Sequence, residues 1–142
     1  MSHENVENAR RIYATLGEAY RAGDPSIFRP MLEEYSDQDV VFEPGGILPD
    51  SARRPYKGWD GVLAFIGVQM EAFSERWLEA TEFIDCGDYL VVPYRMGGRA
   101  RHTGLPVEFS FAHLITIQDG KVVRLQVYRN QAEALEAAGL SE

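Results

Sequence analysis

The sequence has one cysteine, no long apolar run and few basic residues. Cys86 has no partner for an internal disulfide and no companion for a thiolate metal site. No stretch of about 18 apolar residues exists, so we expect no membrane-spanning helix. Lys and Arg number 14 against 22 Asp and Glu, a formal net charge of −8. A nucleic-acid or anionic-membrane partner is therefore not expected, because both require a basic face.

Motifs for targeting, metals and cofactors are also missing. The N-terminal residues "MSHENVENARR" contain no apolar segment of the signal-peptide kind, so the sequence predicts a cytoplasmic protein. His3, His102 and His113 lack the spacing of metal ligands, and no glycine-rich phosphate loop follows a strand. We expect neither a metal nor a cofactor.

The 142 residues suit one domain, residues 1–142, that begins with helices. An apolar stripe at helical spacing predicts a first helix that ends at Gly23. The stripe consists of Val6, Ala9, Ile12, Tyr13, Leu16, Ala19 and Tyr20. Asp24 and Pro25 are typical of the start of a second helix, in which Pro30 predicts a kink or break. A short strand is expected over 39–43, and the helical period returns over 59–73.

Beyond residue 76 the apolar period changes to two, which predicts strands. The expected strands are 77–84, 89–96, 99–103, 107–117 and 122–128. Turns are predicted between them at "DCGD", "MGG", "TGLP" and "QDGK", and a short helix closes the chain before Gly139. The Gly- and Pro-rich stretch 44–58 is long for a connection, which favours a functional loop. Helices beside a sheet of successive antiparallel strands predict an α+β fold.

Several segments in this order resemble the nuclear transport factor two-like superfamily, and within it the SnoaL-like group related to ketosteroid isomerases and polyketide cyclases. The segments are "AGD" (22–24), "DVVFEP" (39–44), "YKGWDGVLAFI" (56–66), "FAHLITIQDGKVVR" (111–124) and "YRNQAEALEAAGL" (128–140). The resemblance implies a cone-shaped half-barrel: a curved, mostly antiparallel sheet, about three helices from the N-terminal half and a short C-terminal helix. It also implies a deep apolar pocket and a homodimer formed through the outer sheet face.

Site residues can be carried over from the isomerases of this group. Their catalytic base precedes a proline at the end of the first strand, which is Glu43 here. Their helical tyrosine corresponds to Leu16, which cannot donate a hydrogen bond. Their second aspartate corresponds to His113 if the turn differs by one residue, and otherwise to Ala112. The alternation of the strand favours His113, which shares a face with Phe109, Phe111, Ile115 and Ile117.

Other activities of the group fit less well. The cyclases place an acidic residue on the final strand, where this sequence has Val127. The epoxide hydrolases use an Asp-Arg-Asp relay, and Arg99 and Arg101 have no paired aspartates nearby. We therefore expect an isomerase, dehydratase or cyclase-like reaction before epoxide hydrolysis.

The leading hypothesis is a cofactor-free enzyme of the lyase or isomerase type that moves a proton on a small hydrophobic carbonyl or hydroxyl compound. His113 would act as acid/base or oxyanion donor, with Glu43 facing it across the pocket. The expected substrate-binding residues are Tyr13, Leu16, Tyr20, Trp59, Phe111, Ile115 and Val127. The alternatives are a non-catalytic ligand-binding protein of the same fold, or a dimeric accessory domain with a filled interior.

Overall fold

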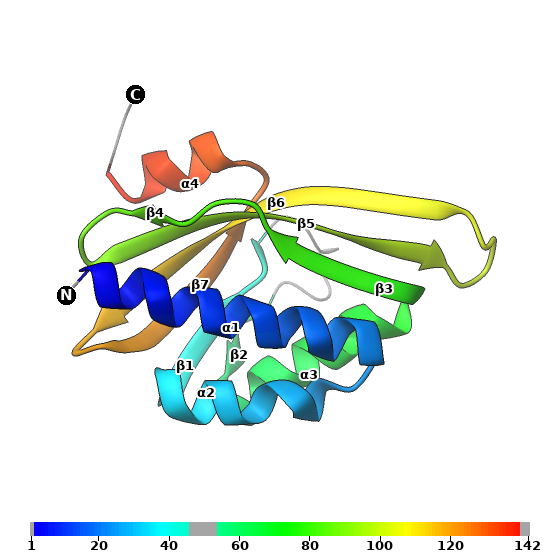
Figure 1. Ribbon diagram of the computed structural model, residues 1–142, viewed down its shortest axis with the longest axis horizontal. Helices are drawn as coiled ribbons and strands as arrows, with labels where there is room; N and C mark the ends of the chain where they lie inside the picture. Colours follow the sequence, from blue (N-terminus) through cyan, green and yellow to red (C-terminus); the bar gives the residue numbers. More distant parts are fainter. Residues whose placement is uncertain (1, 46–53, 140–142) are drawn as a thin grey trace.

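The computed structural model describes residues 2–45 and 54–139, which form one curved sheet with helices on both faces (Figure 1). The helices are α1 (Ser2–Ala22), α2 (Arg29–Tyr35), α3 (Gly58–Glu71) and α4 (Gln131–Ala137), with the 3-10 turn η1 (Pro25–Phe28) before α2. The strands are β1 (Ser36–Glu43), β2 (Tyr56–Lys57), β3 (Phe73–Ala80), β4 (Ile84–Asp85), β5 (Tyr89–Ala100), β6 (Pro106–Gln118) and β7 (Lys121–Tyr128). None of the helices in these residues is long and apolar enough to cross a membrane.

The strands are hydrogen-bonded in the order β2-β1-β7-β6-β5-β3, and β4 pairs with β5. Strand β1 runs parallel to β7, while the other neighbouring strands are antiparallel. Helices α1, α2 and α3 cover one face of the sheet, and α4 lies on the other (Figure 1). The predicted α+β cone with a short C-terminal helix is thereby confirmed.

The N-terminal helices follow their sequence signals. Gly23 adopts a φ of 69°, which suits glycine and ends α1. The Asp24 side chain then accepts a hydrogen bond from the Ser26 amide and caps η1. The 3-10 turn gives way to α2 at Arg29, one residue before Pro30, so the predicted break lies here.

Several predictions for residues 44–103 differ from the structure. The expected strand 77–84 is divided into β3, which ends at Ala80, and β4. Residues 46–53 of the expected functional loop lie outside the described residues, and its end forms β2, which we did not predict. The "MGG" segment is not a turn, because β5 continues through it to Ala100 and no separate strand covers 99–103. A Cβ atom at Gly98 would lie 2.6 Å from the Ser74 carbonyl oxygen, so this glycine permits close approach of β3 to β5.

Helix α4 shows which side of β6 faces inward. On the outer face, Ala134 of α4 packs with Val91, Ala112 and Leu114, all of which are buried. His113, between two of these residues, therefore points to the inner face, where α1, α2 and α3 pack. The choice between His113 and Ala112 is settled in favour of His113.

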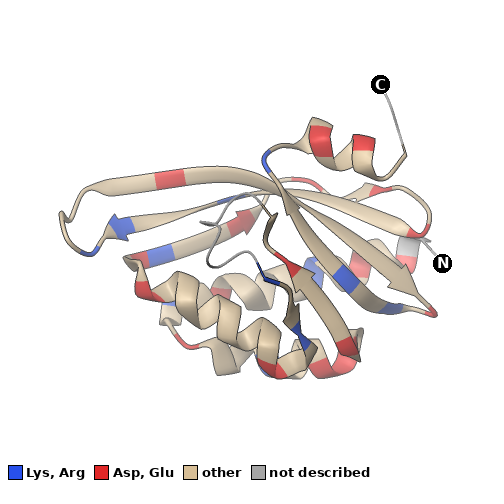
Figure 2. Ribbon diagram, turned by 180° about the vertical axis from the view of Figure 1, so that it is seen from behind, with Lys and Arg blue, Asp and Glu red and all other residues tan. Residues whose placement is uncertain are grey.

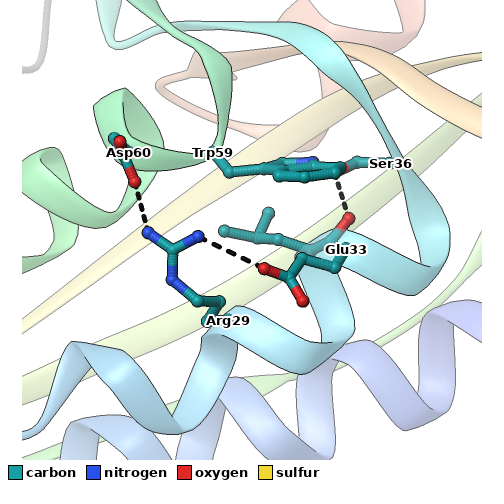
Figure 3. Close-up of polar contacts among 6 residues, drawn as sticks. Arg29, Glu33, Ser36, Trp59 and Asp60 are labelled. Carbon is teal, nitrogen blue, oxygen red and sulfur yellow. Dashed lines mark hydrogen bonds and ion pairs between the residues drawn. The ribbon is translucent and has the colours of Figure 1, made fainter.

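A group of polar contacts fixes the start of α3 against α2 and β1 (Figure 3). Arg29 of α2 pairs with Asp60 of α3 and with Glu33 on its own helix. The Trp59 indole N–H donates to Ser36 Oγ over 3.1 Å, and the Ser36 hydroxyl donates to the Leu32 carbonyl oxygen over 2.6 Å. Elsewhere, basic and acidic residues alternate along the ribbon and do not gather in one place (Figure 2).

Candidate functional site

A cavity of about 80 Å³ lies between the helices and the inner face of the sheet. Most of its wall is aliphatic or aromatic, from all three covering helices and from five strands. The side chains in this wall that carry polar groups are Tyr13, Tyr20, Tyr35, Ser36, Gln69, Tyr94 and His113. Among the described residues that line it, none is Asp, Glu, Lys or Arg. The cavity is thus an apolar space with a few neutral polar groups, the usual character of a small-ligand pocket.

His113 is the titratable group of the β6 wall. Its side chain is 6% exposed, and its Nδ1 lies 2.6 Å from the Tyr13 hydroxyl of α1. Burial lowers the pKa of His113 to about 3, because the charged imidazolium would lose its hydration. Burial also raises the pKa of Tyr13. Both side chains are therefore uncharged at neutral pH, and His113 Nε2 has no hydrogen-bond partner among the described residues.

Tyr94 of β5 lies beside His113. The two rings stack with their centroids 4.1 Å apart and an angle of 24° between their planes. Tyr94 is 3% exposed, and its hydroxyl makes no hydrogen bond to another described residue. Burial, reinforced by the nearby Tyr20 and Tyr13, raises the pKa of Tyr94, so its hydroxyl remains protonated. No fully buried side-chain nitrogen or oxygen atom of the described residues lacks a hydrogen-bond partner, so the Tyr94 hydroxyl keeps accessible surface in the cavity wall.

The helices contribute a second polar pair. The Tyr20 hydroxyl of α1 donates a 2.6 Å hydrogen bond to Gln69 Oε1 of α3, and both side chains line the cavity. Burial raises the pKa of Tyr20, which keeps this hydroxyl protonated as well. Sequence reasoning did not identify Gln69. The available signal was its spacing, since Val62, Ile66 and Gln69 follow one face of α3.

The structure brings several expected site residues together. Tyr13, Leu16, Tyr20, Ile115 and His113 all line the cavity. Three others contribute to the surrounding core: Phe111 contacts Tyr94 with ring centroids 6.0 Å apart, Val127 is buried, and Trp59 is held by Ser36. The contact between Trp59 and Ser36 shows how this side chain anchors α3.

Glu43 is not brought to the cavity. On β1, Val40 and Phe42 point to the inner face, so Glu43 points to the outer one. Its carboxylate pairs there with Arg124 of β7 over 2.8 Å. The expected arrangement of Glu43 and His113 facing one another across the cavity is therefore wrong. The reason is strand alternation, which separates neighbouring residues of β1 onto opposite faces.

The polar groups of the cavity can bind an oxygen atom without carrying charge. A neutral imidazole or phenol that donates into a water-poor space can polarise a carbonyl. No group of three or more His, Cys, Asp and Glu side chains within residues 2–45 and 54–139 could hold a metal ion. The Tyr, Gln, Ser and His side chains that line the cavity can donate and accept hydrogen bonds and, at His113, transfer a proton.

Solved structures with this fold cover nearly the whole chain. A candidate SnoaL-like polyketide cyclase from Jannaschia sp. CCS1 is 19% identical, with a TM-score of 0.70 over 96% of this chain and 91% of that one. An NTF2-like protein of unknown function from Burkholderia pseudomallei K96243 is 25% identical, with a TM-score of 0.69 over 93% and 95%. A protein with a ketosteroid isomerase-like fold from Catenulispora acidiphila DSM 44928, in complex with trimethylamine, is 15% identical, with a TM-score of 0.66 over 91% and 92%.

Sequence comparison gives the family directly. No curated protein matches the chain. The family model of the SnoaL-like domain matches residues 9–125, which make up most of the chain and include every residue that lines the cavity. The protein therefore belongs to the SnoaL-like domain family.

Proposed function

We propose that the cavity binds a compact, neutral carbonyl or hydroxyl compound, with the oxygen of the ligand held by Tyr94 and His113. The observation that carries this proposal is the Tyr94 hydroxyl, which belongs to a buried residue of the cavity wall, keeps accessible surface and makes no hydrogen bond to another described residue. Beside it, His113 has one ring nitrogen engaged by Tyr13. A ligand oxygen that accepts from Tyr94 Oη and His113 Nε2 would supply the missing partner.

The composition of the cavity selects against ions. A carboxylate or an ammonium group would lose its hydration there without an opposite charge from the described lining residues. The neighbour that binds trimethylamine supports a small ligand, although an amine cation would find no acidic partner among the lining residues described here. Small ketones and phenols fit this chemistry better.

The volume of the cavity also favours a small ligand. A volume of about 80 Å³ is several times the minimum that holds one water and below the ~150 Å³ of an engineered cavity that accepts benzene. Short-chain ketones are therefore the probes that fit this volume directly, and a six-membered ring such as cyclohexanone requires the lining side chains to move apart on binding.

Proton transfer is the second candidate function, and the short Tyr13–His113 contact favours it. In the tautomer with hydrogen on Nδ1, His113 donates to Tyr13, and the lone pair on Nε2 can accept a proton. That nitrogen would take the proton from the carbon next to a ligand carbonyl. The electron pair of the broken C–H bond would be delocalised onto the carbonyl oxygen, which forms an enolate. This oxygen would accept a hydrogen bond from Tyr94. Return of the proton from Nε2 to another ligand atom completes an isomerisation. Departure of a hydroxyl group from the β-carbon with its bonding electrons, as water that takes the proton from Nε2, completes a dehydration.

One experiment tests both candidates. Cyclohexanone is titrated into the protein and into Tyr94→Phe, with Tyr89→Phe on the same strand as the matched control, because Tyr89 is 36% exposed. We expect Tyr94→Phe to weaken binding by about 3- to 10-fold, the range for one lost hydrogen bond, and Tyr89→Phe to bind normally. No measurable binding of small ketones and phenols, or equal binding by Tyr94→Phe, would overturn the proposal.

The same samples in D₂O test catalysis. Exchange of the α-hydrogens of cyclohexanone for deuterium is the simplest proton transfer that the site could perform. If His113 acts as the base, the wild type accelerates this exchange and His113→Asn does not. Binding without accelerated exchange would leave the non-catalytic function.

A further inference from the structure

We infer that Gln69, positioned by Tyr20, is a second polar anchor of the cavity and selects ligands with a second oxygen atom. This inference rests on the proposed function, since the first oxygen is the one held by Tyr94 and His113. The two anchors belong to different layers, because Tyr94 and His113 project from the sheet whereas Tyr20 and Gln69 project from the helices. A ligand held by both would span the cavity between the layers.

The hydrogen bond from Tyr20 fixes the orientation of the Gln69 amide. Because Gln69 Oε1 accepts from the Tyr20 hydroxyl over 2.6 Å, the amide oxygen faces α1. A glutamine side chain also carries two N–H donors, and these have no acceptor among the described residues. Tyr20 is 3% exposed and both residues line the cavity, so the pair is built into its wall.

Ser36 shows that a polar group in the same wall can be fully occupied. Its hydroxyl oxygen accepts from the Trp59 indole, and its hydrogen is donated to the Leu32 carbonyl oxygen (Figure 3). The Ser36 hydroxyl therefore already donates one hydrogen bond and accepts another within the protein, which leaves it little capacity to bind a ligand. The Gln69 amide differs because one half is fixed within the protein and the other half remains available.

The two anchors together define a ligand class. Each can donate a hydrogen bond, so the matching ligand carries an acceptor oxygen at each end. The cavity that both anchors line is apolar and compact, so the matching ligand is a short chain or a single ring of no more than six atoms. A neutral ring compound with two opposed carbonyl or ether oxygens fits this description, and 1,4-cyclohexanedione is its simplest probe.

The test compares two ligands that differ by one oxygen. Cyclohexanone and 1,4-cyclohexanedione share a six-membered ring, and their dissociation constants are measured by NMR titration. We expect the wild type to prefer the dione by about 3- to 10-fold beyond the twofold statistical gain of its two identical ends. Gln69→Met, which keeps the length of the side chain but removes the amide, should abolish that excess preference. Val68→Thr is the matched control on α3, because Val68 is 53% exposed, and it should keep the preference.

A second variant, Tyr20→Phe, keeps the inference testable if Gln69→Met does not fold. Tyr20→Phe keeps the ring but releases the Gln69 amide, so it should reduce the preference without removing the amide. If the wild type binds cyclohexanone and shows no excess preference for the dione, or if Gln69→Met keeps that preference, the inference is overturned while the proposed function stands. If neither ketone binds, the proposed function fails and this inference with it.

Discussion

The two faces of the sheet place titratable side chains in very different surroundings. On the inner face, His113 is enclosed by aromatic rings and burial lowers its pKa to about 3. On the outer face, Glu43 forms a partly exposed ion pair with Arg124. The environment, and not the residue type, decides which of them can contact a buried ligand. A chemically attractive pair in the sequence becomes a site only if both members have the same orientation.

The burial of His113 on the inner face should have its largest effect on the pH dependence of the free energy of unfolding. The pKa of His113 is about 3 in the folded chain against its ordinary value of 6.5, so the unfolded chain binds the proton first as the pH falls. His113 therefore does not reduce the free energy of unfolding above pH 6.5. As the pH falls from 6.5 to about 3, protonation of the unfolded chain progressively lowers that free energy. From pH 7 to pH 4 this amounts to about 3 kcal/mol of unfolding free energy.

Urea denaturation of the wild type and His113→Asn at both pH values measures this loss. Acidic groups elsewhere titrate in both proteins, so the wild type should lose about 3 kcal/mol more than the variant. An equal decline in the two proteins would show that His113 is not held neutral by burial.

Removing the partner of His113 should have the next largest effect. Tyr13→Phe leaves the buried Nδ1 without its hydrogen bond, which we expect to cost about 2 kcal/mol of unfolding free energy at pH 7. Tyr89→Phe, on the exposed side of the fold, should change the stability by less than about 0.5 kcal/mol. Similar values for the two variants would contradict the structural importance of the Tyr13–His113 contact.

A smaller effect is expected at the anchor of α3. Ser36→Ala removes the acceptor of the partly buried Trp59 N–H and should cost about 1 kcal/mol in urea denaturation. Ser110→Ala, at an exposed position of β6, is the control and should be nearly neutral. A neutral Ser36→Ala would mean that this hydrogen bond does not fix α3.

Glu43→Gln should have the smallest effect. Because the ion pair with Arg124 is partly exposed, its loss should cost less than about 1 kcal/mol, and this difference should shrink at high salt. Cyclohexanone affinity should not change. A strong loss of ketone binding in Glu43→Gln would restore the carboxylate to the site and contradict the separation of the two faces.

Sequence patterns predicted the architecture because apolar periodicity records burial. The alternation of β6 placed His113 inside, and the stripe of α1 placed Tyr13, Leu16 and Tyr20 at the cavity. The same alternation on β1, with Val40 and Phe42 inside, already indicates that Glu43 is outside. The family resemblance favoured Glu43 without regard to this pattern, and the prediction was wrong for that reason.

Other features depend on tertiary contacts that no local pattern records. Gln69 became a candidate through its contact with Tyr20, 49 residues away in the sequence. The two glycines at 97 and 98 resemble a turn signal, but they serve the approach of neighbouring strands. In each case the same residue types are compatible with two local structures, and packing between distant segments decides between them.

The most direct test of the account is the state of the His113 ring in solution. Long-range ¹H–¹⁵N NMR, with His113→Asn to assign the signals, reports the protonation and tautomer of the imidazole between pH 4 and 8. The account predicts a neutral ring over this whole range, with hydrogen on Nε2 in the free protein and an Nε2 signal that shifts when cyclohexanone is added. A titration near pH 6.5 with no response to any small ketone or phenol would contradict it.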